Sequence, residues 1–250
     1  MKPMVRKLFS PRWILVHLGV SLLIFTMMNL GFWQLRRLDE KRELNKAVAT
    51  RSELPVVSLT AANASSLQEW QRVSVTGSYQ FDKAVTIINR STNGAAGYDS
   101  AVPFHTTFGA TILVNRGFVP LATANPSPPE GELSVVGYVR PTQSRGALGA
   151  VDSTDPNTTE FQRFDIPLIM KHVGEPPFPL YIQLLKESPN PNQELPAHIA
   201  LPEPSEGPHL SYAAQWFFFS ATALTAWVVV VRRKLRESSS DDLAPSGTSA

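Results

Sequence analysis

Two long apolar stretches, one near each end of the chain, dominate the hydrophobic pattern. The first runs from Trp13 to Leu35 and the second from Tyr212 to Val231, and neither contains a charged residue. A helix needs about 20 apolar residues to cross a hydrocarbon core of about 30 Å. Both stretches carry Trp near their ends, where indole rings favour the membrane interface. The pattern predicts transmembrane helices over 13–35 and 212–231.

Basic residues outside these stretches predict their orientation. The tail 1–12 carries four Lys or Arg residues, and the tail 232–250 carries four more. Short basic tails stay in the cytoplasm, and an even number of spans puts both tails on one side. No small-x-small cleavage pattern closely follows the first stretch, so we expect an uncleaved anchor. We therefore expect a cell (inner) membrane protein with both termini cytoplasmic and residues 36–211 outside.

The pattern of apolar and polar residues between the two stretches changes at Pro55. Before it, Leu35, Leu38 and Leu44 form a narrow apolar stripe, so the first helix should continue outward to about Thr50. After it, alternating apolar and polar positions predict short strands. The predicted strands are 71–79, 84–89, 98–107, 111–115, 133–140 and 179–186, with a hairpin around Phe108-Gly109-Ala110.

One short helix is predicted among these strands, over 166–173. Asp165 would cap it, Pro167 suits its first turn and Gly174 would end it. The C-terminal tail 232–250, rich in Ser and Asp after Glu237, is expected to be disordered. Together the elements predict an α+β, β-rich domain, shaped as a small partly open barrel or as a curved sheet.

Composition then narrows the functional classes. The formal net charge is only +2, so we expect no nucleic-acid partner. The absence of cysteine excludes disulfides, thiolate metal sites and a cysteine nucleophile. No pair of the five histidines has the spacing of a closed metal site, and no phosphate loop, zinc-protease helix or nucleophile elbow occurs. We therefore expect no enzyme activity.

Three short motifs remain as candidate functional sites. The first, Gly31-Phe32-Trp33-Gln34-Leu35-Arg36-Arg37, lies where the first helix leaves the membrane. The second, Asn115-Arg116-Gly117-Phe118-Val119-Pro120, ends a predicted strand. The third, His209-Leu210-Ser211-Tyr212-Ala213-Ala214-Gln215-Trp216, opens the second helix and places His209, Tyr212 and Trp216 on one face.

Each motif also has a purely structural interpretation. The first can be an aromatic belt residue followed by a charged stop, and the third can be a histidine that caps and anchors its helix. For the second, we expect Arg116 to brace a turn at Gly117 and Pro120, with partner binding as the alternative.

In their order and spacing, these motifs resemble the surfeit locus protein (Surf/Shy) family. The resemblance covers nearly the whole chain and includes Gly77-Ser78-Tyr79, Val102-Pro103-Phe104 and the segment 137–140. It implies an assembly factor for haem–copper cytochrome c oxidase, which assists insertion or stabilisation of haem a in the catalytic subunit. The implied partners are that subunit, haem a synthase and the lipid bilayer.

The resemblance and the predicted topology both indicate a functional site at the outer ends of the two helices. Antiparallel helices would bring Trp33 and Gln34 beside His209 and Trp216, with Tyr212 on the same face. His209 would then ligate the iron of haem a, and Arg36 or Arg37 would meet the propionates.

Alternatives to this haem site stay open. His17, on the cytoplasmic half of the first helix, is the competing ligand. The chain can instead be a scaffold for oxidase subunits that binds no cofactor. A membrane-anchored enzyme is the third alternative.

Overall fold

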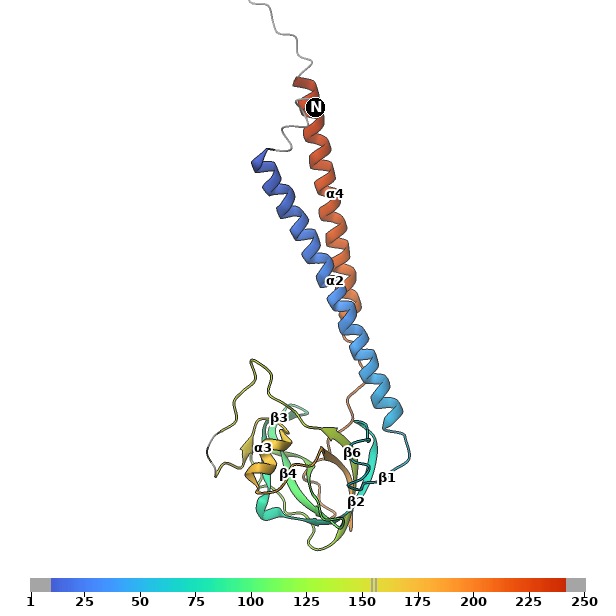
Figure 1. Cartoon of the computed structure of the whole chain (residues 1–250), viewed down its shortest axis with the longest axis vertical. Coiled ribbons are helices and arrows are strands. Elements are labelled where there is room, and N and C mark those ends of the chain that lie inside the picture. The colour runs from blue at the N-terminus through green and yellow to red at the C-terminus, as the bar shows by residue number, and fades with distance from the viewer. Residues whose placement is uncertain (1–9, 154, 156, 242–250) are drawn as a thin grey trace, which may run out of the picture. The chain divides into compact units, whose positions relative to one another are not determined.

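The computed structural model describes residues 10–153, 155 and 157–241, with side chains up to residue 236 (Figure 1). The predictions for 1–9 and 242–250 lie outside the described residues. The chain divides into two units, one built from its two ends and one formed by Lys46–Glu203. Each unit is described by itself.

The terminal unit contains two long helices that run side by side, α2 over Pro11–Arg51 and α4 over His209–Asp241 (Figure 1). Both are long and apolar enough to cross a membrane, which fits a membrane protein. The predicted outward extension of the first helix is confirmed, because α2 continues to Arg51. The expected disorder after Val231 is wrong as far as Asp241: α4 continues there, through Arg, Lys, Leu and Glu residues that favour helix.

A regular seam joins α2 and α4. Most of the buried or half-buried positions on each helix recur at alternating intervals of four and three residues. They are Trp13, His17, Val20, Ile24, Met27, Gly31, Gln34 and Leu38 on α2, and His209, Ala213, Trp216, Ser220, Ala223 and Trp227 on α4. A 3.5-residue repeat is the signature of coiled-coil pairing. The contacts Trp13–Trp227 and Gln34–His209 make the pair antiparallel.

The other unit is a mixed eight-stranded sheet in the order β1-β2-β6-β8-β5-β4-β3-β7. Its strands are β1 (Val57–Ser58), β2 (Arg72–Tyr79), β3 (Val85–Thr92), β4 (Ala95–Thr106), β5 (Thr111–Pro120), β6 (Leu133–Pro141), β7 (Glu160–Phe161) and β8 (Leu180–Ser188). All six predicted strands are present, so the β-rich fold is confirmed. The two-residue strands β1 and β7, and the 3-10 turn η1 (Phe81–Lys83), were not predicted.

The sheet is strongly curved. Strand β2 pairs with β6 from Arg72 to Gly77, and its end from Gly77 to Tyr79 turns to pair with β4. This second contact is short, and the described residues do not close a barrel. The sheet is therefore strongly curved and only partly closed, through the contact of β2 with β4.

The short helix α3 (Ile166–His172) covers one of two apolar clusters of the sheet. Its Ile166, Ile169 and Met170 pack in the cluster that holds Ile87 and Leu113. The second cluster joins side chains of β2, β4, β5, β6 and β8. The prediction of this helix is confirmed: the Asp165 carboxylate accepts a hydrogen bond from the Leu168 amide.

Candidate functional site

His209, the first residue of α4, is held by Gln34 of α2. The distance from His209 Nδ1 to Gln34 Oε1 is 2.8 Å. With the amide oriented in this way, its oxygen can only accept, so Nδ1 carries the proton and donates it. In a neutral ring the lone pair would then lie on Nε2, which has no hydrogen-bond partner among the described residues. A ring with one nitrogen fixed by an acceptor and the other nitrogen free has the arrangement of a metal-binding histidine.

Gly31 explains how the two helices come close enough for this contact. A Cβ atom at Gly31 would lie 2.7 Å from a ring carbon of Phe217 on α4. Phe32 contacts the same ring edge-on, with ring centroids 5.3 Å apart. Gly31 and Phe32 of the first motif therefore allow close packing of the two helices about one turn along α2 from Gln34.

An ion pair lies beyond the histidine, on the side away from Gly31. Arg42 of α2 donates two hydrogen bonds to the carboxylate of Glu206, at 2.9 and 3.0 Å. Arg42 lowers the pKa of Glu206, chiefly through these hydrogen bonds. Both side chains are half exposed, so the pair orients the entry to α4 more than it stabilises it. Sequence reasoning missed this pair.

The other predicted residues on α2 lie apart from His209. The Trp33 side chain is 45% exposed, and the Arg37 guanidinium lies 6.0 Å from its ring. Arg36 is exposed as well. Of the predicted α2 residues, all of which the structure describes, only Gln34 therefore forms a hydrogen bond with His209.

On α4, Trp216 and Tyr212 differ in burial. Trp216 is half-buried in the seam, with its ring 6.2 Å from that of Phe219. Tyr212 is 47% exposed and lies at the edge of the seam. The common helix face predicted for these two residues and His209 is thus only partly turned toward α2.

His17, the competing ligand, lies at the other end of the helix pair. Its ring meets Trp227 edge-on, with centroids 4.8 Å apart, and lies 5.9 Å from the ring of Trp13. Sequence reasoning missed this aromatic surrounding, although the spacing of Trp13 and His17 places both on one helix face.

The second predicted motif does lie at the end of a strand, but it belongs to the strand itself, which continues past the predicted limit at Asn115 to Pro120. Residues Asn115–Pro120 form the second half of β5. The pairing of β4 with β5 skips Arg116, because Ser100 faces Gly117 and Ala101 faces Asn115. The expected turn is a β-bulge. Gly117 has φ +130°, and a Cβ there would lie 2.2 Å from the carbonyl oxygen of Ala197.

The bulge turns the Arg116 side chain into the domain, where it is 1% exposed. Its guanidinium donates to the Pro126 carbonyl at 2.7 Å and to the Glu187 carboxylate at 3.2 Å. The other Glu187 oxygen accepts from the Tyr79 hydroxyl at 2.8 Å. Burial and the Glu187 charge raise the pKa of Tyr79 well above its ordinary value. Arg116 therefore braces a loop and β8. Glu187 was not predicted.

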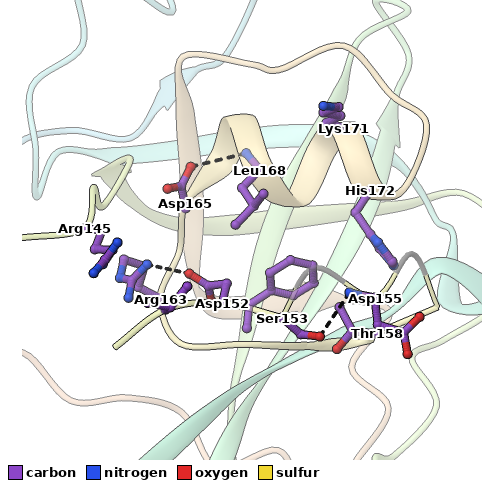
Figure 2. A pocket seen from close by; sticks show the side chains of 12 residues that line it. Arg145, Asp152, Ser153, Asp155, Thr158, Arg163, Asp165, Leu168, Lys171 and His172 are labelled. Atoms are coloured by element: carbon purple, nitrogen blue, oxygen red, sulfur yellow. Dashed lines mark hydrogen bonds and ion pairs between the residues drawn. The ribbon is translucent and has the colours of Figure 1, made fainter. Parts of the chain in front are cut away.

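A pocket of about 670 Å³ lies between α3 and the loop before β7 (Figure 2). Its charged residues are balanced: Arg145, Arg163 and Lys171 against Asp152, Asp155 and Asp165. Figure 2 shows Asp152 bound to Arg163 and Asp165 bound to the Leu168 amide. The positive and negative side chains that line the pocket are therefore equal in number. No group of three metal-binding side chains occurs among the described residues.

Comparisons of the sequence with a family model and with known proteins all indicate the same family. The sequence model of the SURF1 family matches residues 21–221. Surfeit locus protein 1 of Takifugu rubripes is 28% identical over 234 residues, which covers 84% of this chain and 95% of that protein. Human Surfeit locus protein 1 is 26% identical, covering 86% of this chain and 76% of its own length. An uncharacterized SURF1-like protein of Mycobacterium tuberculosis is 27% identical, with coverages of 88% and 84%.

Proposed function

This chain belongs to the SURF1 family, and on that basis we propose that it is an assembly factor for haem–copper cytochrome c oxidase. The proposed task is to assist insertion of haem a into the catalytic subunit or to stabilise it there. The proposed partners are that subunit, haem a synthase and the lipid bilayer. We propose neither an enzyme activity nor a nucleic-acid partner.

The proposed location is the cell membrane, with both termini in the cytoplasm and the sheet domain outside. Two candidate spans support it, as does the basic cluster at Arg232, Arg233, Lys234 and Arg236 after the second apolar stretch.

The hydrogen bond between Gln34 and His209 carries the cofactor part of the proposal. It leaves the Nε2 lone pair available, and neutral imidazole is a common axial ligand of haem iron. His209 would hold the iron of haem a through Nε2, and Gln34 would fix the ring orientation. Trp33, Tyr212 and Trp216 are the proposed apolar contacts of the macrocycle, and Arg36 is the proposed contact of a propionate. Bound haem a would be cargo for the oxidase.

The scaffold without a cofactor remains the second candidate, and one observation favours it. Trp33 and Tyr212, which were expected to flank the macrocycle, are each nearly half exposed. Exposed rings on these helices are equally suited to contact the membrane helices of an oxidase subunit.

Haem content of the full-length protein tests the proposal. Protein purified in detergent from cells that make haem a should show a Soret band. His209→Ala should lose the band, and His17→Ala should keep it. Gln34→Leu should weaken haem binding about 10–100-fold, as loss of a histidine's outer hydrogen-bond partner does at metal sites. Gln34→Glu keeps an acceptor oxygen and should retain haem.

Two outcomes would contradict haem binding at this site. They are a wild-type protein without haem and a His209→Ala variant with full haem content. Either result would leave the scaffold function.

A further inference from the structure

Asn29 presents an amide on the face of α2 that points away from α4. It lies between the seam positions Met27 and Gly31 in sequence, and so on the opposite side of the helix. Its Nδ2 donates to the carbonyl of Phe25 at 2.9 Å. Its Oδ1 has no partner among the described residues, and the side chain is exposed.

An incompletely bonded amide is costly at this depth. Asn29 precedes Gln34 by five residues, which places it about 7–8 Å further along the helix toward the middle of the predicted span. Hydrocarbon offers no hydrogen bonds, and polar side chains on membrane helices therefore usually face protein. The position of Asn29 indicates that another polypeptide covers this face.

A second regular stripe surrounds Asn29. Its members recur at the same intervals of four and three as the seam to α4, and all are exposed: Leu15, Gly19, Leu22, Thr26, Asn29 and Trp33. A Cβ placed at Gly19 would meet nothing within 4 Å, so a neighbouring backbone can approach there. The polar members of this 3.5-residue repeat are Thr26 and Asn29, and the Thr26 hydroxyl already donates to the Leu22 carbonyl. The stripe therefore has the form of a helix–helix seam in which Asn29 fixes the register.

The chemistry of Asn29 fits a second copy of the chain as the occupant. Two copies inserted in the same orientation have parallel α2 helices, which puts both Asn29 side chains at the same depth. An amide carries a donor and an acceptor, so two facing amides satisfy one another across a twofold axis. We propose that the chain forms a homodimer in the membrane through the Leu15–Trp33 stripe of α2, with Asn29 at its centre.

Single-cysteine cross-linking in native membranes tests this dimer, since the chain has no cysteine of its own. Thr26→Cys lies on the stripe, and Met28→Cys is a matched control, because it is at nearly the same depth and exposed but off the stripe. Oxidation should join Thr26→Cys chains into dimers and leave Met28→Cys chains monomeric. Adding Asn29→Leu to Thr26→Cys should weaken association by at least about 3- to 20-fold, the range for one interhelical hydrogen bond, because the symmetric amide pair can form two. Asn29→Gln, which keeps an amide, should restore cross-linking.

Three results would overturn the dimer. They are equal cross-linking at positions 26 and 28, monomers at both positions, and a cross-link from Thr26→Cys to a different protein. Because the test measures association and not haem, it succeeds or fails independently of the proposed cofactor function.

Discussion

Replacing Arg116 with Met should strongly destabilise the sheet domain. The Arg116 and Glu187 side chains are 1% and 5% exposed, so their ion pair is inaccessible to water. Met keeps much of the apolar volume of the arginine stem but leaves the Glu187 carboxylate buried without its cation. Removing one partner of a buried pair costs about 3–5 kcal/mol of unfolding free energy. The Pro126 carbonyl also loses its donor.

A double-mutant cycle separates the ion pair from simple packing loss. Arg116→Met, Glu187→Leu and the double variant are unfolded in urea in detergent, and the β-sheet signal in circular dichroism is followed. The double variant leaves no buried charge at this site, so its loss should be smaller than the sum of the single losses by at least about 1.5 kcal/mol. A single Arg116→Met loss below about 1 kcal/mol, or additive losses, would refute a bracing role for the pair.

Two further predictions concern the sheet domain. Gly117→Ala should cost at least about 2 kcal/mol of unfolding free energy, because the new Cβ would lie 2.2 Å from the Ala197 carbonyl oxygen at φ +130°. The control, Gly146→Ala, lies in open space and should change the unfolding free energy by less than about 0.5 kcal/mol in the same urea assay. Burial raises the pKa of Tyr181 to about 12, so the stability from its neutral phenol is complete below pH 10 and is lost as pH rises toward 12. Tyr181→Phe should reduce the loss of stability in alkaline unfolding and leave the part that comes from buried Tyr79, whose pKa is also raised; an unchanged profile in that variant would contradict the assignment.

The elements that were predicted correctly depend on residues that lie close together in the sequence. The cap, proline and glycine around α3 are all adjacent in the chain, and so is the hairpin between β4 and β5. The strands β1 and β7 have two residues each and exist through parallel pairing with β2 and β3, which no local pattern encodes. At Gly117 the local signal was ambiguous, because a left-handed glycine fits both a turn and a bulge. Only pairing with β4 decides between them.

The same distinction applies to the candidate sites. Predicted spans at both ends of the chain were enough to expect Gln34 beside His209, since antiparallel helices bring their outer ends together. The partners of Arg42 and Arg116 are 164 and 71 residues away, and many other carboxylates in the sequence were equally eligible. Charge alone does not choose among them, so the Glu206 and Glu187 contacts required the tertiary structure.

The two proposals for the helix pair share Trp33 but place their polar residues on different sides of α2, and helix geometry makes those two residues separable. Gln34 lies in the seam to α4, whereas Asn29 lies on the exposed stripe. Five residues at about 100° each place the two side chains roughly 140° apart around the helix axis. Gln34→Leu should therefore change haem content without changing cross-linking at position 26, and Asn29→Leu should do the reverse. If either substitution changed both readouts, then dimerisation and the setting of His209 would be coupled through the packing of α2 against α4. In that case haem loading would depend on the oligomeric state of the chain.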